Sequence, residues 1–161
     1  MELIQFFQQF DLPAILYLMK GITLLGDFHT YFLYVIIILY VFPKKKSLSF
    51  IGILLVSWAV NESLKTGFNI PRPPEEFHLV AVTGLGFPSG HAQMAMVVWG
   101  WVGNQFNRLI PAGVMIFMIG FSRIYLGVHY PNQVLGGWAI GFTLILIWIM
   151  LEKEFWLKEK S

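Results

Sequence analysis

Seven residues in an otherwise apolar sequence have types and spacings that fit one kind of chemistry. They come from three short segments and are, in chain order, Lys65, Arg72, Ser89, Gly90, His91, Arg123 and His129. Arginine forks and lysine ammonium groups bind phosphate oxygens, and the free amides at a helix start favour anions. Two histidines in one anion site allow one imidazole to attack and the other to donate a proton. These residues predict a site for a tetrahedral oxyanion, provided that the fold brings the three segments together.

The composition indicates what kind of fold must do this. Of the 161 residues, 57% are hydrophobic and 12% are charged, whereas an ordinary soluble domain is roughly 45–50% apolar and about 25% charged. This excludes a disordered chain, a basic nucleic-acid-binding domain and most soluble enzymes. The absence of cysteine from the sequence excludes a disulfide scaffold, a thiolate zinc site and a cysteine nucleophile. We therefore expect a small all-α integral membrane protein that binds no nucleic acid.

Apolar stretches of about 20 residues predict a bundle of about five membrane-spanning helices. Their approximate ranges are 26–43, 48–66, 89–106, 108–127 and 132–151. The first 25 residues instead give short amphipathic patterns on either side of Pro13, which suit a helix lying in the membrane interface. A sixth span through 3–24 is the alternative. The predicted parts are thus an interfacial segment 1–25, a transmembrane domain 26–151 with the loop of the site at 67–88, and a tail 152–161.

The basic residues predict how these spans are oriented. In the five-span arrangement seven of the eleven lysines and arginines lie on the side of the tail and four on the other side. The seven are Lys44, Lys45, Lys46, Arg108, Lys153, Lys158 and Lys160. The positive-inside rule then puts the tail in the cytoplasm and the loop 67–88 outside. Because the three motifs end consecutive, alternating spans, they meet on this extracytoplasmic face of a cell (inner) membrane.

Taken together, the motifs resemble the type-2 phosphatidic acid phosphatase superfamily, which includes the vanadium haloperoxidases. The family pattern is K-x6-RP, then PSGH, then SR-x5-H-x3-D. The chain has Lys65 with Arg72-Pro73, then Pro88-Ser89-Gly90-His91, then Ser122-Arg123 with His129. It departs from the pattern at Gln133, where the family usually has aspartate. In this detail it is more similar to the glucose-6-phosphatase and dolichyl-diphosphatase branches, which carry glutamine there.

The resemblance implies a metal-independent phosphatase without a cofactor. His129 would attack phosphorus and form a phosphohistidine, and His91 would protonate the leaving oxygen and later deprotonate water. The phosphate would be held by Lys65, Arg72, Ser89, Gly90 and Arg123. Three fixed cations can take the part that magnesium plays in other phosphoryl transfers.

Local spacing supports the role of His129. Gly127 can end one helix in a left-handed turn, and Pro131 suits the first turn of the next, so His129 should lie just outside that helix. Gln133, four residues on, can reach back to the His129 ring and fix its tautomer. We expect Gln133 to orient His129.

Other polar and small residues have simpler interpretations. Glu62 lies one turn before Lys65 and predicts a salt bridge. Asp27, at the start of the first span, has two interpretations: it lines the mouth of the pocket or, as we expect, it lies at the membrane interface. Gly137 and Gly141 form a G-x-x-x-G motif, which indicates close helix packing, either within the chain or in a homo-oligomer.

The expected substrate is a lipid phosphate or diphosphate in the membrane, such as a polyprenyl diphosphate, phosphatidate or phosphatidylglycerophosphate. A head group at the interface would lie beside the cations while its tails stay in the bilayer. Two alternatives remain open. One is a sugar phosphate, which the glutamine at position 133 suggests. The other is a non-catalytic protein that binds or transports a lipid phosphate.

Overall fold

The computed structural model describes residues 2–9 and 12–158, with side chains described up to residue 154. This part of the chain is helical and contains no β-strand. Its elements are α1 (Glu2–Gln8), α2 (Pro13–Leu24), α3 (Phe28–Val41), α4 (Lys44–Phe68), the 3-10 helix η1 (Glu75–Phe77), α5 (Gly90–Phe106), α6 (Leu109–Tyr125) and α7 (Pro131–Lys158). The predicted all-α class is confirmed, and the five predicted spans correspond to α3–α7 with different ends.

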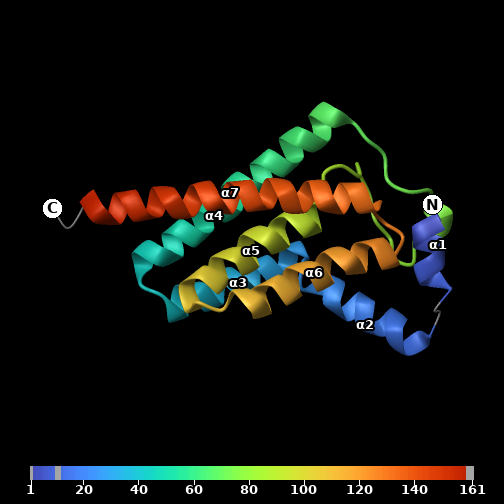
Figure 1. Cartoon of the computed structure of the whole chain (residues 1–161), viewed down its shortest axis with the longest axis horizontal. Coiled ribbons are helices and arrows are strands. Elements are labelled where there is room, and N and C mark those ends of the chain that lie inside the picture. Colours follow the sequence, from blue (N-terminus) through green and yellow to red (C-terminus); the bar gives the residue numbers. More distant parts are fainter. Residues whose placement is uncertain (1, 10–11, 159–161) are drawn as a thin grey trace.

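Helix α5 is the centre of the bundle and packs against α4, α6 and α7 (Figure 1). Phe50 and Ile53 of α4 and Val97 and Trp101 of α5 are fully buried in its largest apolar cluster. The outer surface of the bundle is apolar as well, and Tyr40 of α3 is 92% exposed. An apolar core beneath an apolar surface is what a helical bundle in a lipid environment requires, since lipid tails solvate the outward-facing side chains.

Length and apolar character identify the helices that cross a membrane most readily. Helix α4 and residues Pro131–Glu154 of α7 are each long and apolar enough to cross a membrane alone. Helices α2 and α3, which are bent by 55° relative to each other, make a third span if they cross together. Helix α6 is apolar but only 17 residues long. Helices α1 and α2, at 7 and 12 residues, are each shorter than the predicted sixth span through 3–24.

At the end of the bundle opposite the site, one predicted boundary was wrong and one helix extends past its predicted span. Helix α4 begins at Lys44 after Pro43, so Lys44–Lys46 form its first turn and not a loop. Helix α7 continues through most of the predicted tail to Lys158, and residues 159–161 lie outside the described residues. Ser49 of α4 explains the extension, because its hydroxyl accepts a hydrogen bond from Trp148 Nε1 at 2.8 Å and donates one to Glu152. Both partners lie on the last turns of α7.

Two glycines let α7 approach α5 closely. A Cβ atom at Gly137 would lie 2.6 Å from the Ser89 carbonyl oxygen, and one at Gly141 would lie 2.6 Å from that of Gln93. The G-x-x-x-G motif therefore serves packing within the chain, which is one of its two expected interpretations, and a homo-oligomer stays a prediction. The contact also sets the start of α5 against the start of α7.

The segment between α4 and α5 crosses the end of the bundle where α1 also lies (Figure 1). Gln8 of α1 donates from Nε2 to the carbonyl oxygens of Phe77 at 2.9 Å and Tyr125 at 3.2 Å. The backbone N–H of Leu79 donates to the Leu126 carbonyl at 3.0 Å. Helix α1 and the end of α6 thus hold this segment in place.

Candidate active site

His129 lies in the short connection between α6 and α7. Gly127 has φ of 71°, in the left-handed region, and Pro131 begins α7, as the sequence predicted. A Cβ atom at Gly127 would lie 1.9 Å from the Phe77 carbonyl oxygen, so this close approach requires glycine. The turn leaves His129 just before α7 with only 1% of its surface exposed.

The hydrogen bonds of the His129 ring define its tautomer. Arg72 donates from an Nη atom to His129 Nε2 at 2.7 Å, and the Nδ1 atom lies 3.0 Å from Gln133 Oε1. A guanidinium can only donate, so Nε2 carries the lone pair and Nδ1–H donates to the glutamine. Nε2 is therefore the nucleophilic atom of the ring, and it points at a cation.

Gln133 makes two further contacts, and a carboxylate could not make the second of them. Its Oε1 also accepts the backbone N–H of Tyr130 at 3.2 Å, and its Nε2 donates to the Pro71 carbonyl at 2.7 Å. A Cβ atom at Gly86 would lie 2.5 Å from Gln133 Nε2, so a glycine is needed there too. A carboxylate has no N–H for the Pro71 carbonyl. The glutamine thus joins His129 to the segment that carries Arg72.

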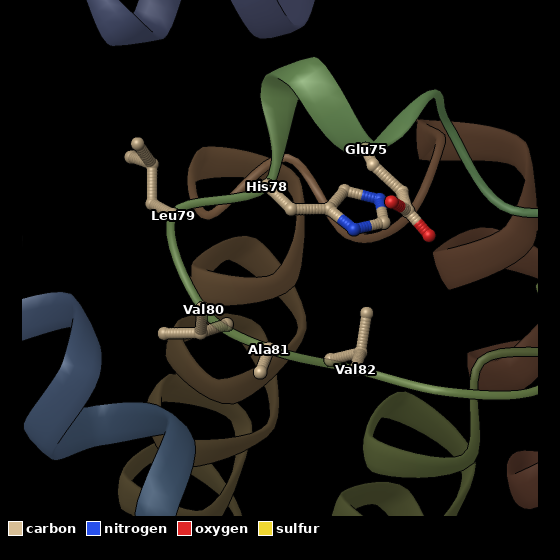
Figure 2. Close-up of a pocket in the computed structure, with 6 residues that line it drawn as sticks. All are labelled: Glu75, His78, Leu79, Val80, Ala81 and Val82. Carbon is tan, nitrogen blue, oxygen red and sulfur yellow. The ribbon is translucent and has the colours of Figure 1, made fainter.

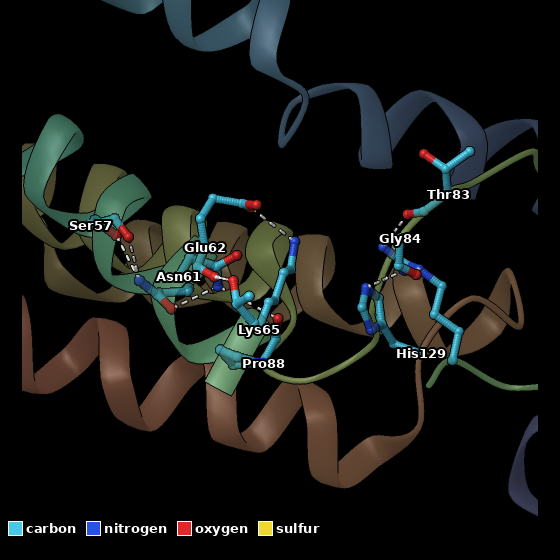
Figure 3. A network of polar contacts seen from close by, with 11 residues as sticks. Ser57, Asn61, Glu62, Lys65, Thr83, Gly84, Pro88 and His129 are labelled. Atoms are coloured by element: carbon cyan, nitrogen blue, oxygen red, sulfur yellow. Dashed lines mark hydrogen bonds and ion pairs between the residues drawn. The ribbon is translucent and has the colours of Figure 1, made fainter. Parts of the chain in front are cut away.

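Arg72 is held by backbone oxygens as well as by His129 (Figure 3). Its Nε donates to the Gly84 carbonyl at 3.0 Å, and its two Nη atoms donate to the carbonyls of Thr83 at 3.2 Å and Val128 at 3.1 Å. Three neutral acceptors fix the guanidinium without cancelling its charge. It therefore remains available to an anion.

The environment keeps His129 neutral. Burial lowers the pKa of His129 well below its ordinary value of 6.5, and the nearby charges of Arg72 and Arg123 lower this pKa further. The hydrogen bond that His129 donates to Gln133 raises this pKa but does not outweigh these effects. A neutral imidazole at pH 7 is what nucleophilic attack from Nε2 needs.

The start of α5 is fixed by a buried polar network from α4 (Figure 3). Asn61 donates from Nδ2 to Gln93 Oε1 at 2.8 Å, and Gln93 donates from Nε2 to the Ser57 carbonyl at 2.8 Å and to the Ser57 hydroxyl at 3.0 Å. Ser89 is the N-cap residue of α5, yet its side chain makes no capping hydrogen bond. Its Oγ atom is buried and has no hydrogen-bond partner within the described part of the chain. This hydroxyl and the free amides of the first turn are available to a bound anion.

Lys65 lies beside the same helix start. A Cβ atom at Gly90 would lie 3.6 Å from Lys65 Nζ. The ammonium group is 3.3 Å from Glu62 Oε1, which confirms the predicted salt bridge. The Glu62 side chain is 54% exposed, so solvent screens this pair and the lysine can exchange it for a phosphate oxygen.

The Arg123 guanidinium and the His91 imidazole are both held by residues at the bend between α2 and α3. Arg123 donates from an Nη atom to Thr23 Oγ1 at 2.6 Å, while its Nε atom is buried and unpartnered among the described residues. His91 Nε2 lies 2.7 Å from Asp27 Oδ1. The expectation that Asp27 lies at the membrane interface was therefore incomplete, because its carboxylate faces His91.

All eight residues singled out in the sequence lie at one end of the bundle. The charges of Arg72 and Arg123 act on both His91 and His129, so these four groups share one electrostatic site. Lys65 and Ser89 border it from α4 and the start of α5. Among the residues that the structure describes, no three histidine or carboxylate side chains are grouped to hold a metal ion.

A family comparison agrees with the motifs. The model of the PAP2 superfamily matches residues 46–156, which is well over half of the chain. The chain belongs to the PAP2 superfamily. The resemblance drawn from the three motifs is thereby confirmed.

Individual PAP2 relatives are similar over much of the chain. Phosphatidylglycerophosphatase B of Bacillus subtilis is 32% identical over 100 residues, which cover 55% of this chain and 49% of that protein. Human dolichyldiphosphatase 1 is 25% identical over 130 residues, covering 67% of this chain and 53% of that protein. The chain thus spans about half the length of these curated relatives. A crystal structure of a transmembrane PAP2-type phosphatidylglycerolphosphate phosphatase from Bacillus subtilis superposes with a TM-score of 0.85 and 25% identity, over 95% of this chain and 84% of that one.

The loop of this PAP2 chain also contains a pocket of about 410 Å³ (Figure 2). Its lining residues are Glu75, His78, Leu79, Val80, Ala81 and Val82. One nitrogen of the His78 ring, Nε2, lies 2.9 Å from the Pro73 carbonyl oxygen and donates to it. None of the eight residues singled out in the sequence is among these lining residues.

The sequence interpretation missed four supporting residues of the site, Thr23, Ser57, Asn61 and Gln93. Their common signal is a polar side chain inside an apolar helix, which is rare and expensive in a membrane protein. That signal marks them as important without indicating which distant residue each one contacts.

Proposed function

We propose that this PAP2 chain is a membrane phosphatase that removes phosphate from a lipid phosphate or diphosphate through a phosphohistidine at His129. The observation that carries the proposal is the hydrogen bonding of the His129 ring. Gln133 accepts Nδ1–H, which leaves the Nε2 lone pair directed at Arg72. A nucleophile beside the cation that binds its target is the arrangement expected for attack on a phosphoryl group.

The first step forms the covalent intermediate. A phosphoryl oxygen of the substrate takes over the Arg72 donor that His129 Nε2 now accepts. Nε2 then bonds to phosphorus while the bond from phosphorus to the leaving oxygen breaks. The leaving oxygen takes a proton from the His91 imidazolium, so that it departs as an alcohol or a phosphate.

The second step releases the phosphate. Neutral His91 accepts a proton from water, and the water oxygen bonds to phosphorus as the bond to His129 Nε2 breaks. His129 returns to its neutral form and His91 to its protonated form. One substrate and one water give one dephosphorylated product and one inorganic phosphate.

The charge that develops on the phosphoryl oxygens is balanced by fixed cations. Arg72 and Arg123 are supplied by the loop and by α6, and Lys65 by α4. Ser89 Oγ and Arg123 Nε, which are buried and have no partner among the described residues, support the same assignment, because a phosphate oxygen would satisfy both. Donors that are already oriented stabilise a transition state without reorganisation.

A lipid substrate is favoured by the surroundings of the site. The site lies at the end of a bundle whose surface is apolar, so lipid tails can lie along the helices while the head group reaches the cations. The names of the similar proteins, a phosphatidylglycerophosphatase and a dolichyldiphosphatase, support a phosphorylated lipid. The sugar-phosphate alternative has two supports. One is a similarity to glucose-6-phosphatase catalytic subunit 1 of Haplochromis xenognathus, 27% identical over 123 residues, which cover 65% of this chain and 43% of that protein. The other is Gln133, which the contact with Pro71 explains without reference to the substrate.

The proposed location is a cell membrane with the site on its extracytoplasmic side, and the distribution of basic residues supports it. The chain contains no cysteine, so single introduced cysteines can test this. Ala81 lies in the loop and Lys153 near the opposite end of α7, and both are exposed. In intact cells Ala81→Cys should react with a membrane-impermeant maleimide, and Lys153→Cys only after permeabilisation. The reverse pattern would place the site inside the cell.

Phosphate release by purified protein tests the activity. Wild type should release phosphate from at least one phosphatidylglycerophosphate, phosphatidate or polyprenyl diphosphate in the presence of chelator, and His129→Ala should release none. His29 is an exposed histidine at the start of α3, so His29→Ala is the matched control and should keep wild-type turnover. A protein that binds these lipids and releases no phosphate would be a binding or transport component, and release from glucose 6-phosphate alone would favour the sugar reading.

A further inference from the structure

The bend between α2 and α3 places an acidic side chain beside a catalytic histidine. Helix α2 ends at Leu24, α3 begins at Phe28, and the two are bent by 55°. Asp27 occupies the N-cap position of α3, where an aspartate ordinarily accepts an N–H group of the first turn. Here the Asp27 side chain makes no capping hydrogen bond. Its Oδ1 atom instead lies 2.7 Å from His91 Nε2. The carboxylate is thus turned away from its usual local partner and toward the site.

The bend also lies directly against the His91 ring. A Cβ atom at Gly26 would lie 2.9 Å from His91 Cδ2 and 2.9 Å from Ile119 Cγ2. Only a residue without a side chain lets the backbone come this close. The side chains of His91 and Asp27 are 22% and 37% exposed, so the pair faces the open side of the site.

One turn earlier, the same bend contacts a phosphate-binding group. Thr23 Oγ1 accepts the 2.6 Å hydrogen bond from Arg123, and the two residues are 6% and 4% exposed. The end of α2 and the bend therefore hold two members of the site, the Arg123 guanidinium through Thr23 and the His91 imidazole through Asp27.

We propose that Asp27 is a positioning residue of the phosphatase. Its carboxylate accepts Nε2–H of His91, which orients the ring, leaves Nδ1–H for the leaving oxygen and stabilises the imidazolium that donates this proton. This rests on the proposed function, in which His91 is the proton donor. In the resting site the carboxylate accepts Nε2–H. As the bond to phosphorus breaks, the leaving oxygen becomes basic and takes the Nδ1 proton, while Nε2–H stays on Asp27. In the second step Asp27 stabilises His91 as it accepts a proton from water.

The charged groups around His91 show why the Asp27 carboxylate is needed to stabilise its protonated form. The groups that act on it are Arg72 from the loop, Arg123 from α6, His129 from the connection to α7, and Asp27 from the bend. Of these, Asp27 alone is anionic. Burial opposes a positive charge on His91 most strongly, and Arg123 and Arg72 oppose it as well, so the protonated form needs the Asp27 carboxylate beside it. The two histidines thus have different partners. His129, the proposed nucleophile, must stay neutral and has the neutral Gln133 beside it, whereas His91, the proposed acid, must be charged and has the anionic Asp27.

The test compares Asp27→Asn with Glu76→Gln, an exposed carboxylate of η1 that serves as the control. Each protein is assayed on a lipid phosphate, whose alkoxide needs a proton to leave, and on p-nitrophenyl phosphate, whose phenolate does not. General acid catalysis contributes about 10²–10⁴-fold. Asp27→Asn should therefore lower the ratio of lipid to p-nitrophenyl turnover by at least about tenfold. The alkaline limb of its kcat–pH profile should also move to lower pH, because its imidazolium is less stabilised.

The turnover ratio is measured within one preparation and is independent of how much of the variant is folded. An unchanged ratio in Asp27→Asn, with an unmoved alkaline limb, would overturn the proposal and leave Asp27 a structural role. Thr23→Val supplies a contrast, since it should raise KM for both substrates and leave the ratio at the wild-type value. Failure of the proposed function looks different, because wild type and His129→Ala would then release equal amounts of phosphate from both substrates.

Discussion

Gln133 is the residue at which the chain departs from the usual family pattern, and its side chain can be tested one hydrogen bond at a time. It accepts His129 Nδ1–H at 3.0 Å and Tyr130 N–H at 3.2 Å, and it donates to the Pro71 carbonyl at 2.7 Å. Gln133→Ala removes all three bonds. Gln133→Glu keeps the acceptor for His129 and Tyr130 and removes only the donor to Pro71.

The magnitudes follow from these contacts. Each intramolecular hydrogen bond contributes about 0.5–1.5 kcal/mol net, so Gln133→Ala should lose about 1.5–4.5 kcal/mol of stability. Its His129 ring no longer has a fixed tautomer, and a cost of about 1–3 kcal/mol in the transition state corresponds to about 5–150-fold in kcat. Gln133→Glu should lose about 1–3 kcal/mol of stability, because its carboxylate faces the Pro71 carbonyl unpaired. Its kcat per folded molecule should stay within about tenfold of wild type, since a tenfold change needs 1.4 kcal/mol.

The assay measures kcat on a lipid phosphate in detergent micelles together with thermal unfolding of the same preparation. Gln5→Ala, an exposed glutamine of α1, is the control and should change neither quantity. Wild-type turnover in Gln133→Ala would refute the idea that Gln133 fixes the His129 tautomer. Equal losses of kcat in the alanine and glutamate variants would show that the Pro71 contact matters and the His129 contact does not.

Three further predictions concern the same site. Because the pKa of His129 is lowered and its neutral form is the nucleophile, the acid limb of kcat/KM should lie below pH 6.5, and Arg72→Gln should move that limb to higher pH. Gly86→Ala should abolish most activity and lower the unfolding temperature, because its Cβ atom would lie 2.5 Å from Gln133 Nε2 and 2.6 Å from the Pro71 carbonyl oxygen. Addition of EDTA should leave phosphate release unchanged, and restoration of a lost activity by Mg²⁺ would contradict the assignment of charge stabilisation to Lys65, Arg72 and Arg123.

The sequence predicts best what depends on short spacing. The left-handed Gly127, the helix start at Pro131 and the reach of Gln133 to His129 all lie within seven residues, so local backbone geometry decides them. The convergence of the three motifs follows from alternating helix directions, which apolar stretches alone indicate. These parts of the site needed no knowledge of side-chain packing.

The contacts that the sequence could not predict join distant residues. His91 meets Asp27 across 64 positions, and Arg123 meets Thr23 across 100. The amphipathic pattern of residues 1–25 indicates a surface helix but not which surface it covers, and α2 packs along α6. Periodicity identifies a face, whereas the partner of that face is set by the packing of the whole bundle.

The helix ends were missed for a related reason. Hydropathy marks the lysines at 44–46 as the end of an apolar stretch, although the helix itself accommodates them in its first turn. Lys46 Nζ, for example, donates to Gln105 Oε1 at 2.8 Å near the end of α5. Apolar length predicts the part of a helix that lies in lipid, and the helix continues beyond it.

Trapping the covalent intermediate tests the central claim most directly. Wild type, His129→Ala and His29→Ala are mixed with a lipid phosphate labelled with ³²P, quenched in alkali within the first turnovers and digested for mass spectrometry. Wild type and His29→Ala should carry alkali-stable, acid-labile phosphate on His129, bound at Nε2, and His129→Ala should carry none. Label on another residue, or rapid phosphate release with the same low labelling in all three proteins, would contradict attack by His129.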